Sequence, residues 1–294
     1  MTNKIYFVDR SVIIKIRDKT LTADQEAMLR SIDLPSNRVS PLLACFEGQK
    51  GVLQTEEELR AVIERDTEIL DSFFEFANTN DVQKIASPEH ITAIINRQEE
   101  RWGAYAEFVG FSQLTLFQPI GKIQIKQIQN DIAQEAIRLG IPLSSIFVLC
   151  ALACLYQQKD AHEILKPSLK RGGTPKRVHN ALQDLSAIML YNTISMLLQQ
   201  GPIKIATGYI TFDGWVKRFM ELTNVRGGAL TVTNIMVSQV NFDLSQELFP
   251  KASKAEFESI CELLGVIKDE HSYAPPWYPI EIRFKMNIPS ASDE

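Results

Sequence analysis

Hydrophobic residues open the chain as one short run that a single acid interrupts. Ile5 to Val8 are all apolar or aromatic, Asp9 follows, and the apolar run resumes at Val12. A short apolar run is typical of a buried strand, and we predict a strand at residues 4–8. Burying a lone carboxylate in apolar surroundings is costly unless the carboxylate is paired or binds a metal. We therefore expect Asp9 at the open end of this strand, where something positive meets it.

Most later apolar positions recur every three or four residues, which is typical of one face of a helix. Thr22 begins a capping-box sequence, Thr55 caps a long helix, and Gly140 ends another. Helices are predicted at about residues 22–32, 41–48, 55–77, 88–109, 120–140, 146–156, 160–165, 178–200, 215–222 and 255–265.

Strand patterns are rarer after the first one. They predict strands at about residues 203–211, 230–240 and 280–288, and they indicate a hinge or turn at Gly227–Gly228. Few strands among many helices indicate an α/β fold, a sandwich with a small, mainly parallel sheet and extra helices.

Composition limits the class of protein more than it identifies one. The chain has 294 residues, of which 45% are hydrophobic and 23% are charged, so a sizeable core is expected. The net charge of −5 excludes a polycation that coats nucleic acid over its whole surface. A local basic patch remains compatible with this charge.

The sequence also predicts the compartment. The N-terminus has no signal-peptide pattern, and the longest apolar run, residues 146–156, is too short to span a bilayer. The four cysteines lie in apolar helical patterns and form no Cys-x-x-Cys pair, so we interpret them as small core residues. We expect a cytoplasmic protein with no membrane contact.

Four acids lie at boundaries of the predicted elements. Asp9 and Asp213 follow strands, Glu47 ends a helix, and Asp184 lies near the start of another. The carboxyl ends of parallel strands share the sheet edge where ligands bind, so Asp9 and Asp213 are expected there. Four carboxylates repel one another unless divalent cations neutralise them, and oxygen ligands favour Mg²⁺ or Mn²⁺. The sequence therefore predicts a metal site at this edge.

A basic segment precedes Asp184. Residues 166–177 carry five formal positive charges and no acid, and their glycine pair and two prolines predict a loop. This loop is either a solvated connector or a clamp for RNA phosphates, which cationic side chains bind without regard to sequence. The candidate phosphate-binding residues are Lys170, Arg171, Lys176 and Arg177.

The acids and their surroundings resemble the PIN-domain family of metal-dependent ribonucleases. Four segments carry the resemblance, and they occur in the family's order: Phe7-Val8-Asp9-Arg10-Ser11, the helix from Ser40 to Glu47-Gly48, Asp184-Leu-Ser-Ala-Ile-Met-Leu, and Thr211-Phe-Asp213. Asp131, which a helix also carries, is a rival for the third acid.

The resemblance implies a three-layer sandwich over residues 1–225, with a helical insertion at about 56–175. Residues 226–294 would form a C-terminal strand–helix–strand extension packed on the same domain. The implied activity is that of an Mg²⁺- or Mn²⁺-dependent endoribonuclease that hydrolyses phosphodiester bonds of single-stranded or structured RNA. The implied catalytic metal ligands are Asp9, Glu47, Asp184 and Asp213, with Ser11 and Thr211 orienting ligands or substrate.

Several alternatives stay open. Asp9 is also interpretable as a helix cap, Glu47 as a solvated helix end, Asp184 as an exposed helix position, and Asp213 as the start of an Asp-Gly turn. Many relatives in this family are toxins or defence effectors, which implies an inhibitory, antitoxin-like protein partner. A homodimer is the candidate assembly. The alternative function is a catalytically degenerate, nuclease-like scaffold that binds a protein partner through its helical insertion.

Overall fold

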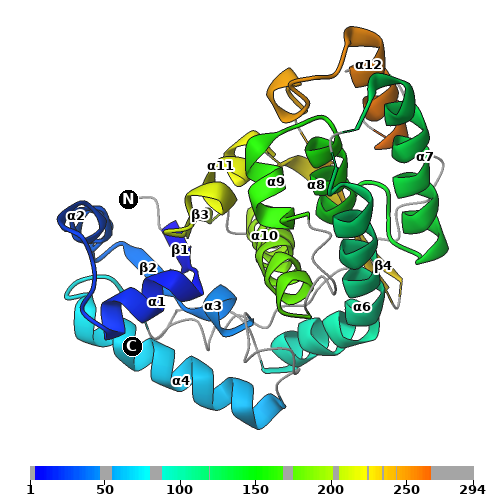
Figure 1. The fold of residues 1–294 in the computed structure, drawn as a ribbon. Coiled ribbons are helices and arrows are strands. Elements are labelled where there is room, and N and C mark those ends of the chain that lie inside the picture. The colour runs from blue at the N-terminus through cyan, green and yellow to red at the C-terminus, as the bar shows by residue number, and fades with distance from the viewer. Residues whose placement is uncertain are drawn as a thin grey trace.

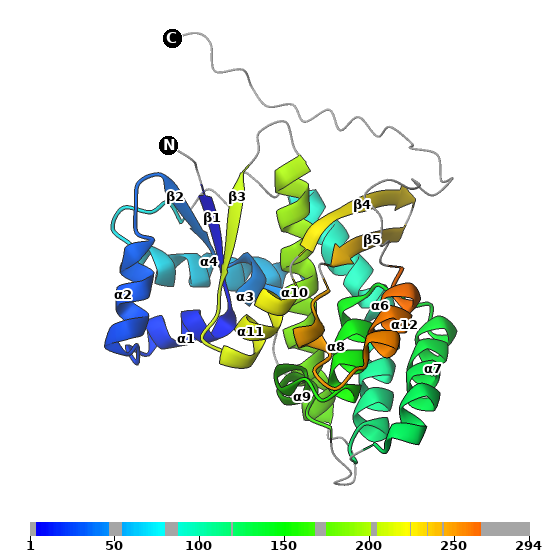
Figure 2. The ribbon, with the colours of Figure 1, turned by 90° about the horizontal axis from the view of Figure 1, so that it is seen from above.

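A computed structural model describes residues 4–46, 55–79, 88–118, 120–167, 175–200, 205–223, 225–233, 235–242 and 244–265. Figures 1 and 2 show two views of the ribbon. The strands are β1 (Lys4–Val8), β2 (Asn37–Ser40), β3 (Ala206–Ile210), β4 (Val225–Thr233) and β5 (Ile235–Phe242). The helices are α1 (Arg10–Arg17), α2 (Ala23–Ser31), α3 (Leu42–Phe46), α4 (Glu56–Phe73), α6 (Pro88–Thr115), α7 (Lys122–Arg138), α8 (Ile146–Leu155), α9 (Lys159–Leu165), α10 (Pro175–Gln200), α11 (Gly214–Leu222) and α12 (Lys254–Leu263), with a short 3₁₀ helix at Gln246–Leu248.

The first strand ends where the sequence predicted, and a helix follows it at once. The apolar residues after Asp9 form α1, whose buried face carries Val12, Ile13 and Ile16. The Asp9 carboxylate caps this helix by accepting the backbone N–H of Ser11. Because α1 begins directly after β1, the acid that caps this helix lies at the carboxyl-terminal edge of the sheet.

Three parallel strands form the main sheet in the order β2-β1-β3. Lys4 pairs with Asn37 of β2 on one side and with Ala206 of β3 on the other. The chain moves from β1 to β2 and later returns to the opposite side of β1, so the strand order reverses between β1 and β3. The α/β fold with a small parallel sheet is therefore confirmed.

Helices cover both faces of this sheet. Val8 of β1 packs in one cluster with Val12 of α1 and Leu70 of α4. Phe7, on the opposite face of the strand, packs with Leu43 of α3 and Leu190 of α10. Side chains alternate between the two faces of a strand, so a central strand that is covered on both faces has apolar residues at successive positions.

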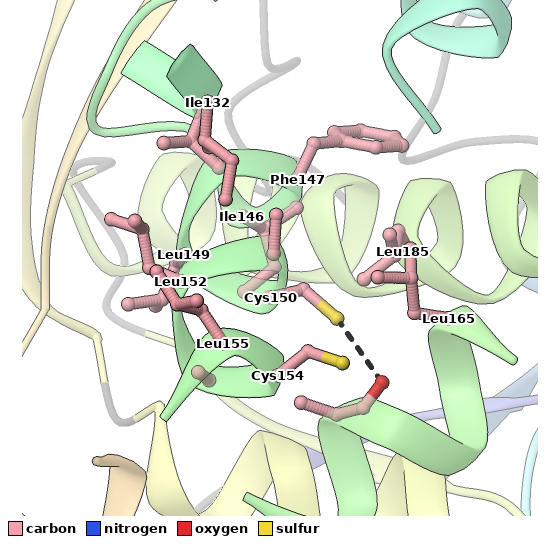
Figure 3. Close-up of a cluster of buried hydrophobic side chains, with 14 of the residues drawn as sticks. Ile132, Ile146, Phe147, Leu149, Cys150, Leu152, Cys154, Leu155, Leu165 and Leu185 are labelled. Atoms are coloured by element: carbon pink, nitrogen blue, oxygen red, sulfur yellow. Dashed lines mark hydrogen bonds between the residues drawn. The ribbon is translucent and has the colours of Figure 1, made fainter. Parts of the chain in front are cut away.

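A second apolar cluster fills the helical part of the molecule around α8. All ten residues of α8 are buried. The long helix α10 contributes Leu182 and Leu185 to this cluster, and its later residue Leu190 packs on the sheet. Figure 3 shows the cluster, in which the Cys150 thiol donates a hydrogen bond to the carbonyl oxygen of Ala161 at an S···O distance of 3.7 Å.

All four cysteines are buried free thiols, which confirms their prediction as core residues. Burial raises the pKa of the Cys154 thiol to about 12, so this thiol stays protonated at neutral pH. Within the described residues, no helix is both long and apolar enough to cross a membrane.

Two strand predictions need correction. Gly227–Gly228 lies within β4 and is not a hinge, although the register shifts between Val225 and Gly227. Residues 230–240 belong to two antiparallel strands, since Thr233 of β4 pairs with Ile235 of β5. Alternation along a sequence marks extended chain and does not show where that chain reverses. The strand predicted at residues 280–288 lies outside the described residues.

The strand β2 had no signal in the sequence. Its four residues, Asn-Arg-Val-Ser, include one apolar side chain, and pairing with β1 holds it in place. A strand this short takes its conformation from its neighbour more than from its own pattern.

Candidate active site

Asp9 lies at the carboxyl end of β1 and is only 6% exposed. Its backbone N–H donates to the carbonyl oxygen of Ile210 at 2.9 Å, which ties it to the end of β3. Its carboxylate accepts hydrogen bonds from the Thr211 hydroxyl and from the Ser11 backbone N–H. Burial raises the pKa of Asp9, these hydrogen bonds oppose the rise, and the nearby charge of Asp213 adds to it.

Asp213 follows β3 and caps α11. Its Oδ1 accepts the backbone N–H groups of Trp215 at 2.9 Å and Val216 at 3.2 Å. Its own backbone N–H donates to the hydroxyl of Thr211 at 3.0 Å. The same hydroxyl therefore donates to Asp9 and accepts from Asp213, so Thr211 connects the two acids directly.

Ser11 adds a second connection between the two strand ends. Its hydroxyl oxygen accepts the backbone N–H of Phe212 at 3.3 Å. Both residues predicted to orient the site, Ser11 and Thr211, thus hold the loop after β3 against the start of α1. Each hydroxyl can donate and accept, which suits a position between an acid and a backbone N–H.

Asp184 reaches the same region from α10. Burial, followed by the charges of Asp213 and Asp9, raises its pKa to about 7, and the Lys166 ammonium opposes the rise. A carboxylate responds in this way only to charges that lie close by in a poorly solvated region. The structure therefore brings Asp9, Asp184 and Asp213 together, although about 200 residues of chain separate the first from the last.

Asp9 also fills the plainer role that the sequence left open, because it caps a helix. Asp213 caps a helix as well, instead of beginning a separate Asp-Gly turn. Capping and ion binding are compatible, since a carboxylate has about four lone-pair positions. Each cap fixes one oxygen of its acid to a rigid helix start. This fixed geometry is what a metal ligand or an acid catalyst requires.

The donor set fits a hard divalent cation. It consists of carboxylates and hydroxyls, which are the ligands that such cations prefer. Among the described groups, the Lys166 ammonium partly offsets the repulsion between the carboxylates. In the part of the chain that the structure describes, no three acids, histidines or cysteines lie close enough together to hold one ion as placed. Mg²⁺ often keeps several water ligands and uses one or two carboxylates, which this arrangement can supply. The fourth predicted ligand, Glu47, lies outside the described residues.

The predicted basic loop is shorter than expected at its C-terminal end. Helix α10 begins at Pro175, so Lys176 and Arg177 lie in its first turn and not in a loop. Proline is favoured in the first turn of a helix, because its missing N–H has no partner to lose there. Lys170 and Arg171 lie outside the described residues.

Lys166 was part of the basic segment but was not among the selected phosphate-binding residues. It ends α9 in a left-handed conformation, with φ of 51°, which is unusual for a residue that has a side chain. Its charge acts on Asp184. The left-handed backbone that ends α9 cannot be deduced from the identity of a lysine.

The rival acid Asp131 has a different setting. It lies on α7, where its carboxylate accepts a hydrogen bond from the Gln127 side chain at 2.7 Å. Figure 2 shows α7 at the opposite end of the molecule from β1 and β3. Asp184, and not Asp131, is therefore the helix-borne acid that is coupled to Asp9 and Asp213.

A scan against protein-family models and searches of curated proteins and of solved structures found no match.

Proposed function

We propose that this protein is a PIN-like, metal-dependent endoribonuclease whose active site is the carboxylate cluster at the ends of β1 and β3. The observation that supports it most is the position of Asp9 and Asp213 at the ends of β1 and β3, where Thr211 hydrogen-bonds to both residues. Asp184 lies near enough for their charges to raise its pKa. The cluster lies at the carboxyl ends of parallel strands, where the strand order reverses. Ligands of open α/β sheets bind at such points.

Uncompensated acids are the physical reason for expecting a cation. Two of the three have raised pKa values, so the folded chain has a cost for keeping them ionised. A bound Mg²⁺ or Mn²⁺ removes this cost, lowers the pKa of a bound water, and neutralises charge that develops on a phosphodiester. The residues that would hold it are Asp9, Asp184 and Asp213, with Glu47 as the fourth proposed ligand.

The chain's own groups would orient the reaction. Thr211 and Ser11 fix the two strand ends, so Asp9 and Asp213 keep a constant separation while substrate binds. Asp184 would help to hold the cation, and the cation would supply an activated water for attack on the phosphodiester. The proposed products are an RNA fragment with a 5′-phosphate and one with a 3′-hydroxyl.

The direct test is cleavage of an end-labelled single-stranded RNA with Mn²⁺ and with EDTA. We expect the wild type to cleave only with the metal, and Asp9→Asn and Asp184→Asn to lose about 100-fold or more of that activity. Asp131→Asn is the matched control, because it removes a carboxylate from α7 and should retain full activity. Equal cleavage by the wild type and both site variants would contradict the proposal, as would no cleavage with any divalent ion.

The second candidate function is a scaffold that binds a protein partner through the helical insertion. Three large apolar side chains on α6 and α7 favour it: Leu114 is 54% exposed, Ile123 is 97% exposed and Ile137 is 55% exposed. Exposed apolar groups are common individually, and a set on neighbouring helices is typical of a contact surface. The test is a pull-down with the wild type and with the Ile123→Asp and Ile137→Asp variants. Capture of a partner by the wild type, loss of that capture in both variants, and no RNA cleavage by the wild type would together favour this function.

A further inference from the structure

Trp215 lies two residues after Asp213 and carries two cations over its indole ring. The Arg218 guanidinium lies 4.5 Å from the ring centroid, and the Lys159 ammonium lies 5.1 Å from it. Lys159 comes from the start of α9, and Arg218 comes from α11. One aromatic ring is therefore in contact with two positive charges from different helices, because the negative charge of its faces attracts cations.

A buried carboxylate holds the Arg218 side chain in place. Its Nε donates to Oδ1 of Asp160 at 2.8 Å, and the Asp160 side chain is only 9% exposed. Gln158 donates to the other oxygen of Asp160 at 3.1 Å, so the anchor is itself held. The Arg218 side chain remains 49% exposed. A guanidinium has five N–H donors, and no other described residue accepts a hydrogen bond from this one.

The guanidinium lies at the start of α11, beside the residue that follows Asp213. Gly214 directly follows Asp213, and a Cβ placed on Gly214 would lie only 3.2 Å from Nη1 of Arg218. Arg218 thus folds back along α11 to the helix start that Asp213 caps. A side chain at position 214 would push it away, so the glycine makes this close approach possible.

The charges of this group do not cancel. Asp160 compensates Arg218, whereas Lys159 has no carboxylate within ion-pair distance among the described residues. Two cations against one ring, with one carboxylate between them, leave an excess of positive charge that an anion would neutralise. An anion with several oxygens could accept hydrogen bonds from both, and phosphate oxygens pair with a guanidinium fork.

We infer that Lys159 and Arg218, aligned by Trp215, bind a backbone phosphate of single-stranded RNA next to the carboxylate cluster. This inference rests on the proposed ribonuclease function, and it assigns the residues that position the substrate strand. Binding here places a neighbouring phosphodiester at the ends of β1 and β3. Affinity from this pair depends on charge, so it is independent of base sequence and weakens as salt rises.

The experiment measures RNA binding without cleavage. Fluorescence anisotropy of a labelled single-stranded RNA of about twelve nucleotides is followed in EDTA, between about 50 and 200 mM KCl. We expect Lys159→Gln and Arg218→Gln each to weaken binding severalfold at the lowest salt. Each should also reduce the slope of log K against log [salt] by about 0.7, the value for one phosphate contact on a single strand.

Two further variants sharpen the test. Lys126→Gln removes an exposed lysine from α7 and should leave affinity and slope unchanged. Arg218→Lys keeps the charge and loses the fork, so it should keep the slope and still weaken binding. Lys159→Gln breaks no ion pair with a described residue, so its effect does not depend on a damaged fold.

The outcomes separate this inference from the proposed function. Wild-type affinity and slope in both Lys159→Gln and Arg218→Gln would overturn the phosphate-binding pair, and metal-dependent cleavage could still stand. Absence of RNA binding by the wild type would overturn the pair as well. RNA binding that needs Lys159 and Arg218, in a protein that cleaves nothing with any divalent ion, would support the pair and overturn the nuclease.

Discussion

Replacing Asp184 by asparagine should stabilise the folded protein at alkaline pH while it removes the proposed activity. Asp184 on α10 is largely buried near Asp9 and Asp213, and its pKa rises from 3.8 to about 7. The folded state therefore binds this proton more tightly than the unfolded state does. Stability contributed by the group is present below about pH 4 and is lost as pH rises through 7.

The magnitude follows from the two pKa values. A difference of about three units corresponds to about 4 kcal/mol of folding free energy, lost between about pH 4 and pH 7. Asparagine removes the charge but leaves a buried amide, whose desolvation costs about 1–3 kcal/mol if it lacks partners. The expected net gain for Asp184→Asn is therefore about 2 kcal/mol at pH 8, or about 3 °C in Tm for a chain of this length.

The assay is thermal unfolding in EDTA from about pH 5 to pH 8, with Asp131→Asn as the control, which should stay within about 0.5 kcal/mol of wild type. The gain of Asp184→Asn should shrink as pH falls and disappear near pH 5. With Mn²⁺ at about 100 times its Kd, the wild type should gain about 2.7 kcal/mol. The variant should gain much less, because it lacks a ligand.

Two results would refute this reasoning. If Asp184→Asn is less stable than wild type at pH 8 in EDTA, ionisation of the Asp184 carboxylate does not destabilise the folded protein as proposed. If the two proteins differ by the same amount at every pH, the difference comes from packing and not from ionisation.

Two more predictions concern the supports of the site. Thr211→Val should lower the free energy of unfolding by about 1–3 kcal/mol in urea titrations, because Asp9 and Asp213 both lose a hydrogen-bond partner. Thr211→Ser keeps the hydroxyl and should match wild type. A loss in Thr211→Ser with none in Thr211→Val would show that the methyl group matters instead. Asp66→Ala should lower the free energy of unfolding by about 3–5 kcal/mol, because Asp66 is fully buried on α4 and its carboxylate pairs with Arg10. A double variant with Arg10→Met should recover part of this loss. No recovery would contradict the ion-pair explanation.

Local signals predicted most of the elements. The capping boxes at Thr22 and Thr55 are present in the structure, and the helices that they begin lie within the predicted ranges. Such boundaries are predictable because the cap and its N–H partner lie within three residues of each other. The hairpin of β4 and β5 was missed because its pairing is decided by contacts between strands, which a one-dimensional pattern does not contain.

In the candidate site too, features set by nearby residues were predictable, and features set by distant residues were not. The places of Asp9 and Asp213 after strands could be predicted from the chain, because each acid follows a short apolar pattern. Asp184 was predicted near the start of a helix, but α10 begins at Pro175 and Asp184 lies in its interior. The role of Thr211 as a connection between two acids could not be predicted, since its partners lie 202 and two residues away. The two cations against Trp215 could not be predicted either, because Lys159 of α9 reaches the ring of Trp215 only when α9 packs on α11.

The sequence by itself determined most of the helices, the first strand and the class of fold, because hydrophobic periodicity and helix caps act over a few residues. It also fixed which acids end strands. Only the tertiary structure decided that Asp184 joins Asp9 and Asp213, whereas Asp131 stays on α7, at the other end of the molecule. Both acids lie on helices with similar patterns, and the packing of whole helices on the sheet brings one of them to the carboxylate cluster.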